Sequence, residues 1–248
     1  MSLKAVLLDL DDTLCRSNGA PQNNDVMLSV QLAQTRELFE AWGIASEDAS
    51  TFISEFWKHV LEKGRQHFLT DSSFAEPDNI ENARAFLAGH GLDSDPAAVA
   101  RLLDTLFVPM SHRVSLEPYE DTIEVLNAVK GAGLRTGVVT NRWLYGMRVL
   151  EDLAYFGLDN LIDVLVSSEE VGFRKPHPLI FETALERLAV RPDETVMVGD
   201  SYEADILGAR AAGIDAILKL NGREVLPEWE SERRINDLAE LIVLLDHS

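Results

Sequence analysis

The sequence predicts an α/β fold, a doubly wound core of five parallel strands with a helical domain inserted after the first strand. A short apolar run near the N-terminus has the length of a buried strand, and four more such runs occur in the C-terminal half, separated by helix-length segments. Alternating strands and helices are typical of a parallel sheet with helices on both faces. Between these two parts, apolar residues recur every three or four positions for roughly 90 residues, which indicates helices alone.

The first strand is predicted at residues 4–9 because Ala5 to Leu8 is an unbroken apolar run, as in strands buried on both faces of a sheet. Three aspartates, Asp9, Asp11 and Asp12, follow within four positions. Carboxylates this close repel one another unless a positive charge lies between them. A divalent cation, which binds carboxylate and carbonyl oxygens, would remove this conflict.

The inserted helical domain follows a polar, turn-rich stretch at residues 16–24, which is predicted to leave the core as a loop. Its apolar residues keep helical spacing. Phe52, Phe56 and Trp57 lie at core positions of that spacing, so we expect them to pack inside the domain rather than to contact a ligand. The predicted helices are 25–42, 49–61, 79–90 and 96–110.

After residue 117 the pattern changes to helices that alternate with short apolar strands. The predicted strands are 135–141, 162–168, 194–200 and 215–220, and the predicted helices are 118–132, 143–156, 178–188, 203–212 and 235–245. With the first strand they give a sheet of five parallel strands. The predicted domains are therefore residues 1–16 and 117–248 for the α/β core and residues 17–116 for the helical domain.

Composition narrows the range of partners. The 248 residues include 22 Lys+Arg against 42 Asp+Glu, a formal net charge of −20, so neither nucleic acid nor an anionic membrane is an expected partner. Cys15 is the only cysteine, which rules out an intrachain disulfide and favours an intracellular protein. With no leader and no membrane-length apolar run in sight, we expect a cytoplasmic protein, either a monomer or a homodimer.

Polar residues collect after four of the predicted strands. They are Asp9 to Thr13 after the first strand, Thr140 and Asn141 after the second, Lys175 in the loop after the third, and Gly199, Asp200 and Asp205 after the fourth. In a parallel sheet every strand delivers its carboxyl end to the same edge, where ligands bind. Each group alone would be an ordinary turn or helix cap, but four in this order indicate a single site.

The chemistry expected at this edge is phosphoryl transfer. Asp9 and Asp200 can share a divalent metal, for which Mg²⁺ is the expected ion. Lys175, Thr140 and the backbone amides after Asp9 can hold the oxygens of a phosphoryl group. A carboxylate within reach of a phosphate can attack phosphorus, and a second carboxylate can carry the proton. Metal and lysine then neutralise the charge that develops during transfer.

These motifs resemble those of the haloacid dehalogenase-like (HAD) hydrolase superfamily, in the group that carries a helical cap domain after the first motif. They are Asp-x-Asp-x-Thr at 9–13, Thr140, Lys175 and Gly-Asp-x4-Asp at 199–205, and the resemblance covers nearly the whole chain. The resemblance implies a Rossmann-like core with an inserted α-helical cap domain, and it implies an enzyme.

Roles for single residues follow from the resemblance. It implies that Asp9 is the nucleophile and forms an aspartyl-phosphate, and that Asp11 is first the general acid for the leaving oxygen and then the base for water. Thr140 and Lys175 would hold the phosphoryl group, with Lys175 also orienting Asp9.

The resemblance also implies a metal site and its surroundings. The Mg²⁺ ligands would be Asp9, Asp200 and the main-chain carbonyl of Asp11, with Asp205 acting through Lys175 or a metal-bound water. The residues expected to support or line the substrate pocket are Thr13, Asn141, Arg142 and Arg16, of which the two arginines lie beside the motifs in the sequence.

The presence of Asp11 favours a Mg²⁺-dependent phosphatase that acts on a small phosphorylated metabolite. In the family, 2-haloacid dehalogenases lack an acid at the position of Asp11, and phosphonatases replace it. Sugar phosphomutases keep this aspartate but usually carry Gly where the present chain has Asp12. Dehalogenase and phosphomutase activities remain alternatives within the family. A protein that binds a phosphorylated ligand without turnover is the alternative outside it.

Overall fold

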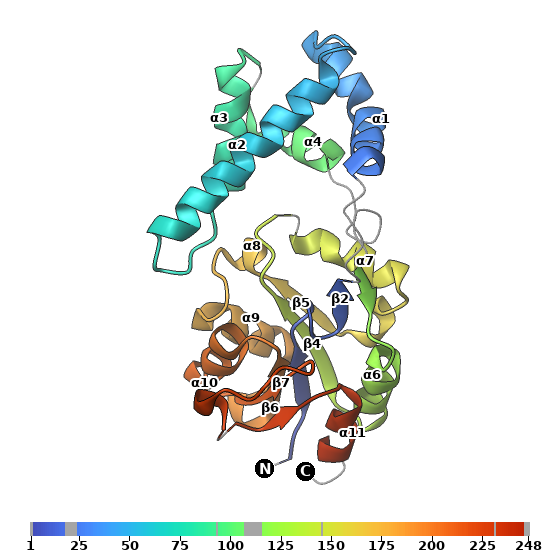
Figure 1. The fold of residues 1–248 in the computed structure, drawn as a ribbon, viewed down its shortest axis with the longest axis vertical. Helices are drawn as coiled ribbons and strands as arrows, with labels where there is room; N and C mark the ends of the chain where they lie inside the picture. The colour runs from blue at the N-terminus through green and yellow to red at the C-terminus, as the bar shows by residue number, and fades with distance from the viewer. Residues whose placement is uncertain are drawn as a thin grey trace. The chain divides into compact units, whose positions relative to one another are not determined.

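The structure, a computed structural model, describes residues 2–17, 24–92, 94–106, 116–144, 146–230 and 232–245. The chain divides into two compact units. One contains Met1–Ala20 and Ser115–Ser248 and holds the sheet, and the other, Pro21–Val114, is built from helices (Figure 1). Among the helices of the described residues, none is long and apolar enough to span a membrane.

The sheet of the first unit is parallel throughout and has the strand order β5-β4-β1-β6-β7-β8. Its strands are β5 (Val164–Ser167), β4 (Arg135–Thr140), β1 (Ala5–Leu8), β6 (Thr195–Gly199), β7 (Asp215–Lys219) and β8 (Arg234–Ile235). All five predicted strands are present, with helices on both faces of the sheet (Figure 1). The prediction of a doubly wound α/β core is therefore confirmed.

The sixth strand, β8, was not predicted from the sequence. Residues 235–245 were expected to form one helix, but only Ala239–Leu245 (α11) is helical. The segment before α11 pairs with β7 instead, through Leu218 N to Arg233 O (2.9 Å) and Leu220 N to Ile235 O (2.8 Å). A two-residue edge strand has no periodicity of its own, so only pairing with a distant strand reveals it.

The order of the strands determines where a site can form. β1 lies between β4 and β6, with Leu8 opposite both Val138 and Val198. The chain therefore builds the sheet outward in opposite directions from β1, which makes the carboxyl end of β1 a topological switch point. The residues that follow β1, β4 and β6 are consequently neighbours at one edge of the sheet.

Helices cover both faces of this sheet. In Figure 1, α9 and α10 lie on one side and α6 and α11 on the other. Phe181 and Ile180 of α9 are fully buried against Leu7 and Met197 of the sheet, which forms one continuous apolar core. The helices are α6 (Thr122–Gly131), α7 (Val149–Tyr155, after a 3₁₀ turn at Gly146–Arg148), α8 (Ser168–Val171), α9 (Pro178–Leu188) and α10 (Gly208–Ala211).

Two further departures from the predicted elements lie close to the motifs. Residues 203–212, predicted as one helix, are a π-helix, η4 (Tyr202–Leu207), followed by α10. A short antiparallel ribbon pairs β2 (Cys15–Ser17) with β3 (Leu116–Pro118), where a loop and a helix start were predicted. The rest of the predicted loop, residues 18–23, lies outside the described residues. The ribbon joins segments about a hundred positions apart, which local sequence patterns do not predict.

The helical unit contains the four predicted helices. They are α1 (Asn24–Trp42), α2 (Ala49–Thr70), α3 (Asn79–Gly89) and α4 (Pro96–Leu106), and the predicted continuation of the last one to residue 110 lies outside the described residues. Phe52 and Phe56 of α2 are buried, and both rings meet Phe86 of α3 edge to face at 5.2 and 5.4 Å between centroids. The expectation that these aromatic residues form a core is confirmed for Phe52 and Phe56, whereas Trp57 is half-buried.

Replacing Phe56 by Ala is expected to destabilise the helical unit by about 3–5 kcal/mol, because the ring is fully buried and its loss leaves a cavity. Urea denaturation measures the change. Leu61→Ala on the same helix is the matched control, since Leu61 is 51% exposed and should cost no more than about 0.5 kcal/mol. Equal stability of the two variants would show that Phe56 is not a core residue.

Candidate active site

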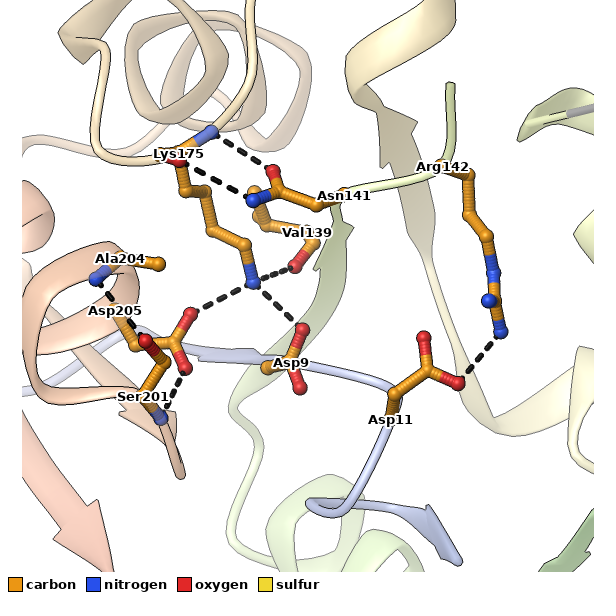
Figure 2. A network of polar contacts seen from close by, with 9 residues as sticks. All are labelled: Asp9, Asp11, Val139, Asn141, Arg142, Lys175, Ser201, Ala204 and Asp205. Atoms are coloured by element: carbon orange, nitrogen blue, oxygen red, sulfur yellow. Dashed lines mark hydrogen bonds and ion pairs between the residues drawn. The ribbon is translucent and has the colours of Figure 1, made fainter. Parts of the chain in front are cut away.

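A buried lysine holds the site together. Lys175 donates from Nζ to Asp9 Oδ1 (2.6 Å), to Asp205 Oδ1 (2.7 Å) and to the main-chain oxygen of Val139 (2.8 Å). These three bonds use all the protons of the ammonium group. Figure 2 shows Lys175 between the two carboxylates, at the junction of β1, β4 and the segment after β6. The sequence prediction that Lys175 lies beside Asp9 and Asp205 therefore agrees with the geometry.

All three charged groups are almost entirely buried. The residues are 7% (Asp9), 3% (Lys175) and 1% (Asp205) exposed. Burial alone would lower the pKa of Lys175, but the carboxylates of Asp205 and Asp9 outweigh it and raise that pKa above its ordinary value. Lys175 is therefore a permanent cation, and removing either partner would leave a buried charge uncompensated.

The backbone of Lys175 is fixed by the residue after β4. Asn141 accepts from Lys175 N through Oδ1 (2.8 Å) and donates through Nδ2 to Lys175 O (3.2 Å). This pair of bonds ties the loop after α8 to the end of β4 (Figure 2). Asn141 was predicted to line the substrate pocket, whereas the structure shows both ends of its amide engaged by the main chain of Lys175.

Asp205 reaches Lys175 from the π-helix η4. Its second oxygen, Oδ2, accepts from Ser201 N (3.0 Å), so both of its carboxylate oxygens are engaged. A side chain on Gly199 would have its Cβ 2.2 Å from Asp205 Oδ2, so only glycine lets Asp205 approach the end of β6. Burial raises the pKa of Asp205 to about 6, although Lys175 opposes that rise.

Asp200 completes a cluster of carboxylates. One oxygen each from Asp9, Asp200 and Asp205 can be chosen so that all lie within 4.8 Å of one another. Such a set of oxygen donors fits a hard divalent cation such as Mg²⁺. Because both oxygens of Asp205 are already engaged, Asp9 and Asp200 have the greater capacity to bind a metal.

The raised pKa of Asp200 also indicates a carboxylate that lacks a full positive partner and could bind a cation. Burial, together with the nearby carboxylates of Asp9 and Asp205, raises the pKa of Asp200 to about 7. Arg223 opposes this rise: its Nη2 donates to the main-chain oxygen of Asp200 (2.6 Å) and lies 3.4 Å from the carboxylate. Arg223 was not predicted from the sequence, because it lies in the loop after β7, where no motif marks it. A single partly exposed arginine leaves Asp200 short of positive charge.

Asp11 has a cation of its own. Arg142 donates from Nη2 to Asp11 Oδ1 at 2.6 Å, and this pair stands apart from the Lys175 cluster (Figure 2). Burial raises the pKa of Asp11, and the Arg142 guanidinium partly offsets the rise. Arg142 was predicted to line a substrate pocket, and its position beside Asp11 keeps it at the site.

Two buried threonine hydroxyls near the ends of β1 and β4 have no hydrogen-bond partner among the described residues. Thr13 and Thr140 are both fully buried, and neither Oγ1 has a hydrogen-bond partner in the described parts of the chain. Buried hydroxyls are normally paired, so two unpaired ones at the carboxyl ends of neighbouring segments are consistent with donors waiting for an anion. Both residues were predicted as site residues.

Arg16, the other predicted pocket residue, is engaged elsewhere. It pairs with Glu117 across the β2–β3 ribbon (Nε to Oε1, 3.2 Å), and its guanidinium lies 5.5 Å from the ring of Tyr119. Its partner in the structure is therefore a ribbon residue and none of the motif residues.

Comparisons with known proteins support the family resemblance found in the motifs. Residues 3–213 match the family of haloacid dehalogenase-like hydrolases. A glyceraldehyde 3-phosphate phosphatase from Methanothermobacter thermautotrophicus is 32% identical over 87% of this chain and 85% of its own length. A ribulose-1,5-bisphosphate 5-phosphatase from Halopiger xanaduensis is 30% identical over 86% of this chain and 83% of its own length.

Solved structures show the same fold. The crystal structure of a HAD phosphatase from Thermococcus onnurineus aligns over 98% of both chains with a TM-score of 0.56 and 26% identity. A 2-haloacid dehalogenase from Pseudomonas syringae pv. Tomato aligns over 99% of both chains with a TM-score of 0.66, and at 24% identity it bears on the fold alone. Motifs, fold and relatives lead to one assignment: the chain is an enzyme that belongs to the haloacid dehalogenase-like hydrolase family.

Proposed function

We propose that this hydrolase is a Mg²⁺-dependent phosphatase that cleaves small phosphorylated metabolites through an aspartyl-phosphate on Asp9. The observation that carries the proposal is the pair of aspartates at the end of β1: Asp9 held by Lys175, and Asp11, two residues on, held by Arg142. We assign Asp9 the role of nucleophile and Asp11 that of proton donor and acceptor, a division that these separate cationic partners support. The phosphatase names of the relatives at about 30% identity support the same reaction class.

The first step is transfer of the phosphoryl group to Asp9. Lys175 occupies Oδ1 of Asp9, which leaves Oδ2 to attack phosphorus as the bond to the leaving ester oxygen breaks. Thr140 and Thr13 donate their free hydroxyls to the phosphoryl oxygens. Asp11 in its protonated form gives its proton to the leaving oxygen, and its burial, which raises its pKa, favours that form.

The second step is hydrolysis of the aspartyl-phosphate. Asp11, now a carboxylate, takes a proton from the water that attacks phosphorus, and the bond to Asp9 Oδ2 breaks. Phosphate leaves, and Asp9 and Asp11 are restored to their initial states. Lys175 keeps Asp9 oriented through both steps because its three bonds are satisfied within the protein.

The residues that would hold Mg²⁺ are Asp9 and Asp200, with the main-chain carbonyl of Asp11 as a further ligand. When bound, the ion supplies positive charge that offsets the charge on the transferred phosphoryl group. Asp205 acts indirectly, because its carboxylate is bonded to Lys175 and to Ser201 N. We also propose that residues 17–116, which contain the helical unit, are the cap domain that the family resemblance implies.

Turnover of p-nitrophenyl phosphate and of a panel of sugar phosphates and other phosphorylated metabolites, with and without Mg²⁺, tests the proposal. Asp9→Asn is expected to lower kcat about a thousandfold or more, because the nucleophile is lost. Asp193→Asn is the matched control, since Asp193 is an exposed carboxylate paired with Arg191 and should leave kcat unchanged.

Other outcomes would contradict the phosphatase proposal. Halide release from a 2-haloacid without phosphate release would show a dehalogenase, and isomerisation of a sugar phosphate would show a mutase. If phosphorylated ligands bind but are not turned over, and Asp9→Asn leaves the background rate unchanged, the protein is a binding protein. Undiminished phosphate release by Asp9→Asn would remove Asp9 from the mechanism.

Mg²⁺ binding is expected to tighten as pH rises. The pKa of Asp200 is about 7 without metal, and the ion binds the carboxylate form, so binding below that pH must release a proton. Isothermal titration should show a Kd that falls about tenfold per pH unit below 7 and levels off above it. Asp200→Asn should bind weakly at every pH, whereas Asp215→Asn, an exposed control, should behave as wild type. A Kd independent of pH would contradict the assignment.

The same pKa shift affects stability. Because the folded-state pKa of Asp200 lies above the ordinary value of 3.8, its contribution to stability is present at low pH and lost as pH rises through 7. Without metal, Asp200→Asn should therefore be more stable than wild type at pH 8, by about 1–2 kcal/mol after screening by solvent, and similar to it at pH 4. Urea denaturation at the two pH values measures this difference.

Arg142→Met is expected to change both substrate binding and pH dependence. The loss of a charged hydrogen-bond donor should raise KM about tenfold. Because Arg142 lowers the pKa of Asp11, its removal should move the basic limb of the kcat profile to higher pH. Arg191→Met, which removes an arginine that is 59% exposed, is the control. An unchanged basic limb would exclude Asp11 as the group that limits the rate there.

A further inference from the structure

A second buried lysine lies near the active site, and the mechanism above does not use it. Lys219 is the last residue of β7, next to β6 in the sheet, and it is only 1% exposed. It is among the largest fully buried side chains of the described residues, which otherwise are apolar. Burial lowers the pKa of Lys219 to about 8, so placing this ammonium group in the interior has a cost in free energy.

The ammonium group is directed at the turn that follows Asp11. Its Nζ donates to the main-chain oxygen of Thr13 (2.9 Å), lies 3.4 Å from that of Asp12, and stands 3.3 Å from the centroid of the Tyr119 ring. Carbonyl oxygens and an aromatic face both attract a cation. No carboxylate of the described residues lies within 4.0 Å of Nζ, so Lys219 is not one half of a buried salt bridge.

Neighbouring groups hold the same turn. Asn221 donates from Nδ2 to Asp12 O (2.7 Å), whereas Leu14 O accepts from Thr122 Oγ1 (2.7 Å) and from Tyr119 N (3.1 Å). Three successive carbonyls, those of residues 12, 13 and 14, are thus bonded to groups at and just after the end of β7 and to Tyr119 and Thr122, which follow β3. Lys219 reaches two of the three through one atom, whereas Tyr119 reaches two through its hydroxyl (Asp12 O, 3.5 Å) and its amide (Leu14 O).

The turn has an uncommon backbone conformation. Asp12 has φ of +56°, in the left-handed region that few residues with a side chain occupy, although aspartate enters it more readily than most. Its conformation sets the direction in which the chain leaves Asp11, one residue before it. If the turn relaxed, the carboxyl group of Asp11 would move away from the ester oxygen that it must protonate.

We propose that Lys219 is a positioning residue for Asp11, which acts by fixing the turn at residues 12–14 through the carbonyls of Asp12 and Thr13. The inference rests on the proposed function, since it assumes that Asp11 transfers a proton. An apolar side chain in this place would pack into the core without the cost of burying a charge. The ammonium group offsets that cost by bonding two backbone oxygens. An apolar side chain would leave Thr13 O without its donor, whereas Asp12 O would keep the bond from Asn221.

Two variants test the inference. Lys219→Met keeps the length of the side chain and removes the charge, and it should lower kcat about 10- to 100-fold while KM for p-nitrophenyl phosphate changes less than about threefold. Asn221→Gly removes the shared bond to Asp12 O from an exposed position, and glycine suits the φ of +54° there, so it should fold normally and lower kcat to a smaller extent. Lys130→Met is the control, because exposed Lys130 also donates to a main-chain oxygen, that of Asn160 (2.9 Å).

Hydrogen exchange supplies a readout that does not depend on catalysis. The amides of Asp12, Leu14 and Cys15 are bonded within the turn, to Cys15 O (2.7 Å), Leu10 O (3.0 Å) and Leu10 O (2.9 Å). In Lys219→Met these amides should exchange about tenfold faster or more, while the strands of the sheet keep their protection. Lys130→Met should leave the exchange of the turn unchanged.

The outcomes separate the two proposals. If the wild-type protein has no phosphatase activity, the proposed function is refuted. The hydrogen-exchange rates of the turn amides then decide by themselves whether Lys219 fixes the turn. An active wild type with an equally active Lys219→Met overturns the positioning role. The positioning role is also overturned if kcat falls only in proportion to the fraction of unfolded protein. It is overturned as well if the turn exchanges at the wild-type rate in both Lys219→Met and Asn221→Gly.

Discussion

The site depends on one buried ammonium group, that of Lys175, placed between the carboxylates of Asp9 and Asp205. Three charges are removed from water here, and such an arrangement is stable only when every proton and lone pair finds a partner. Lys175 meets that condition with its third bond, to the main chain at the end of β4. The loop after β5, the end of β1 and the π-helix after β6 are therefore tied to a single atom. That constraint explains why position 199 is a glycine, since a side chain there would displace Asp205. It also gives a reason for the bond from the backbone of Lys175 to Asn141, which keeps the lysine in place.

Charge balance in the site follows from the same arrangement. Lys175 is shared between two carboxylates, so Asp200 depends on the partly exposed Arg223 and keeps a raised pKa. In a protein whose formal charge is −20, this local deficit is what a divalent cation would satisfy. The proposed Mg²⁺ is thus consistent with the electrostatics of the folded chain as well as with the phosphate chemistry, since an anionic substrate would otherwise meet uncompensated carboxylates.

The two buried lysines illustrate how surroundings decide what a charge does. Lys175 faces carboxylates, and its pKa is raised, so it is a fixed counter-charge for Asp9, the proposed nucleophile. Lys219 faces carbonyl oxygens and an aromatic ring, and burial lowers its pKa, so its proposed role is to bond the turn at residues 12–14 rather than to neutralise an acid. Asp9 is held from the segment between α8 and α9, and the turn after Asp11 is held from the end of β7. The two aspartates, only two residues apart in the sequence, therefore have supports from different parts of the core.

Local sequence was sufficient to identify the α/β core and to bring Asp9, Thr140, Lys175, Asp200 and Asp205 to one edge of it. Parallel strands necessarily end on the same side, and apolar runs mark where each strand ends. What the tertiary structure alone decided are the contacts between segments far apart in the chain: the strand β8, the β2–β3 ribbon, the pairing of Arg142 with Asp11, and the approach of Arg223 and Lys219 from the end of β7. None of these has a periodicity or a motif, because each arises from the register and packing of the finished sheet. The sequence by itself therefore determined which groups meet at one edge of the sheet, and the packing of the fold determined which neighbours hold them in place.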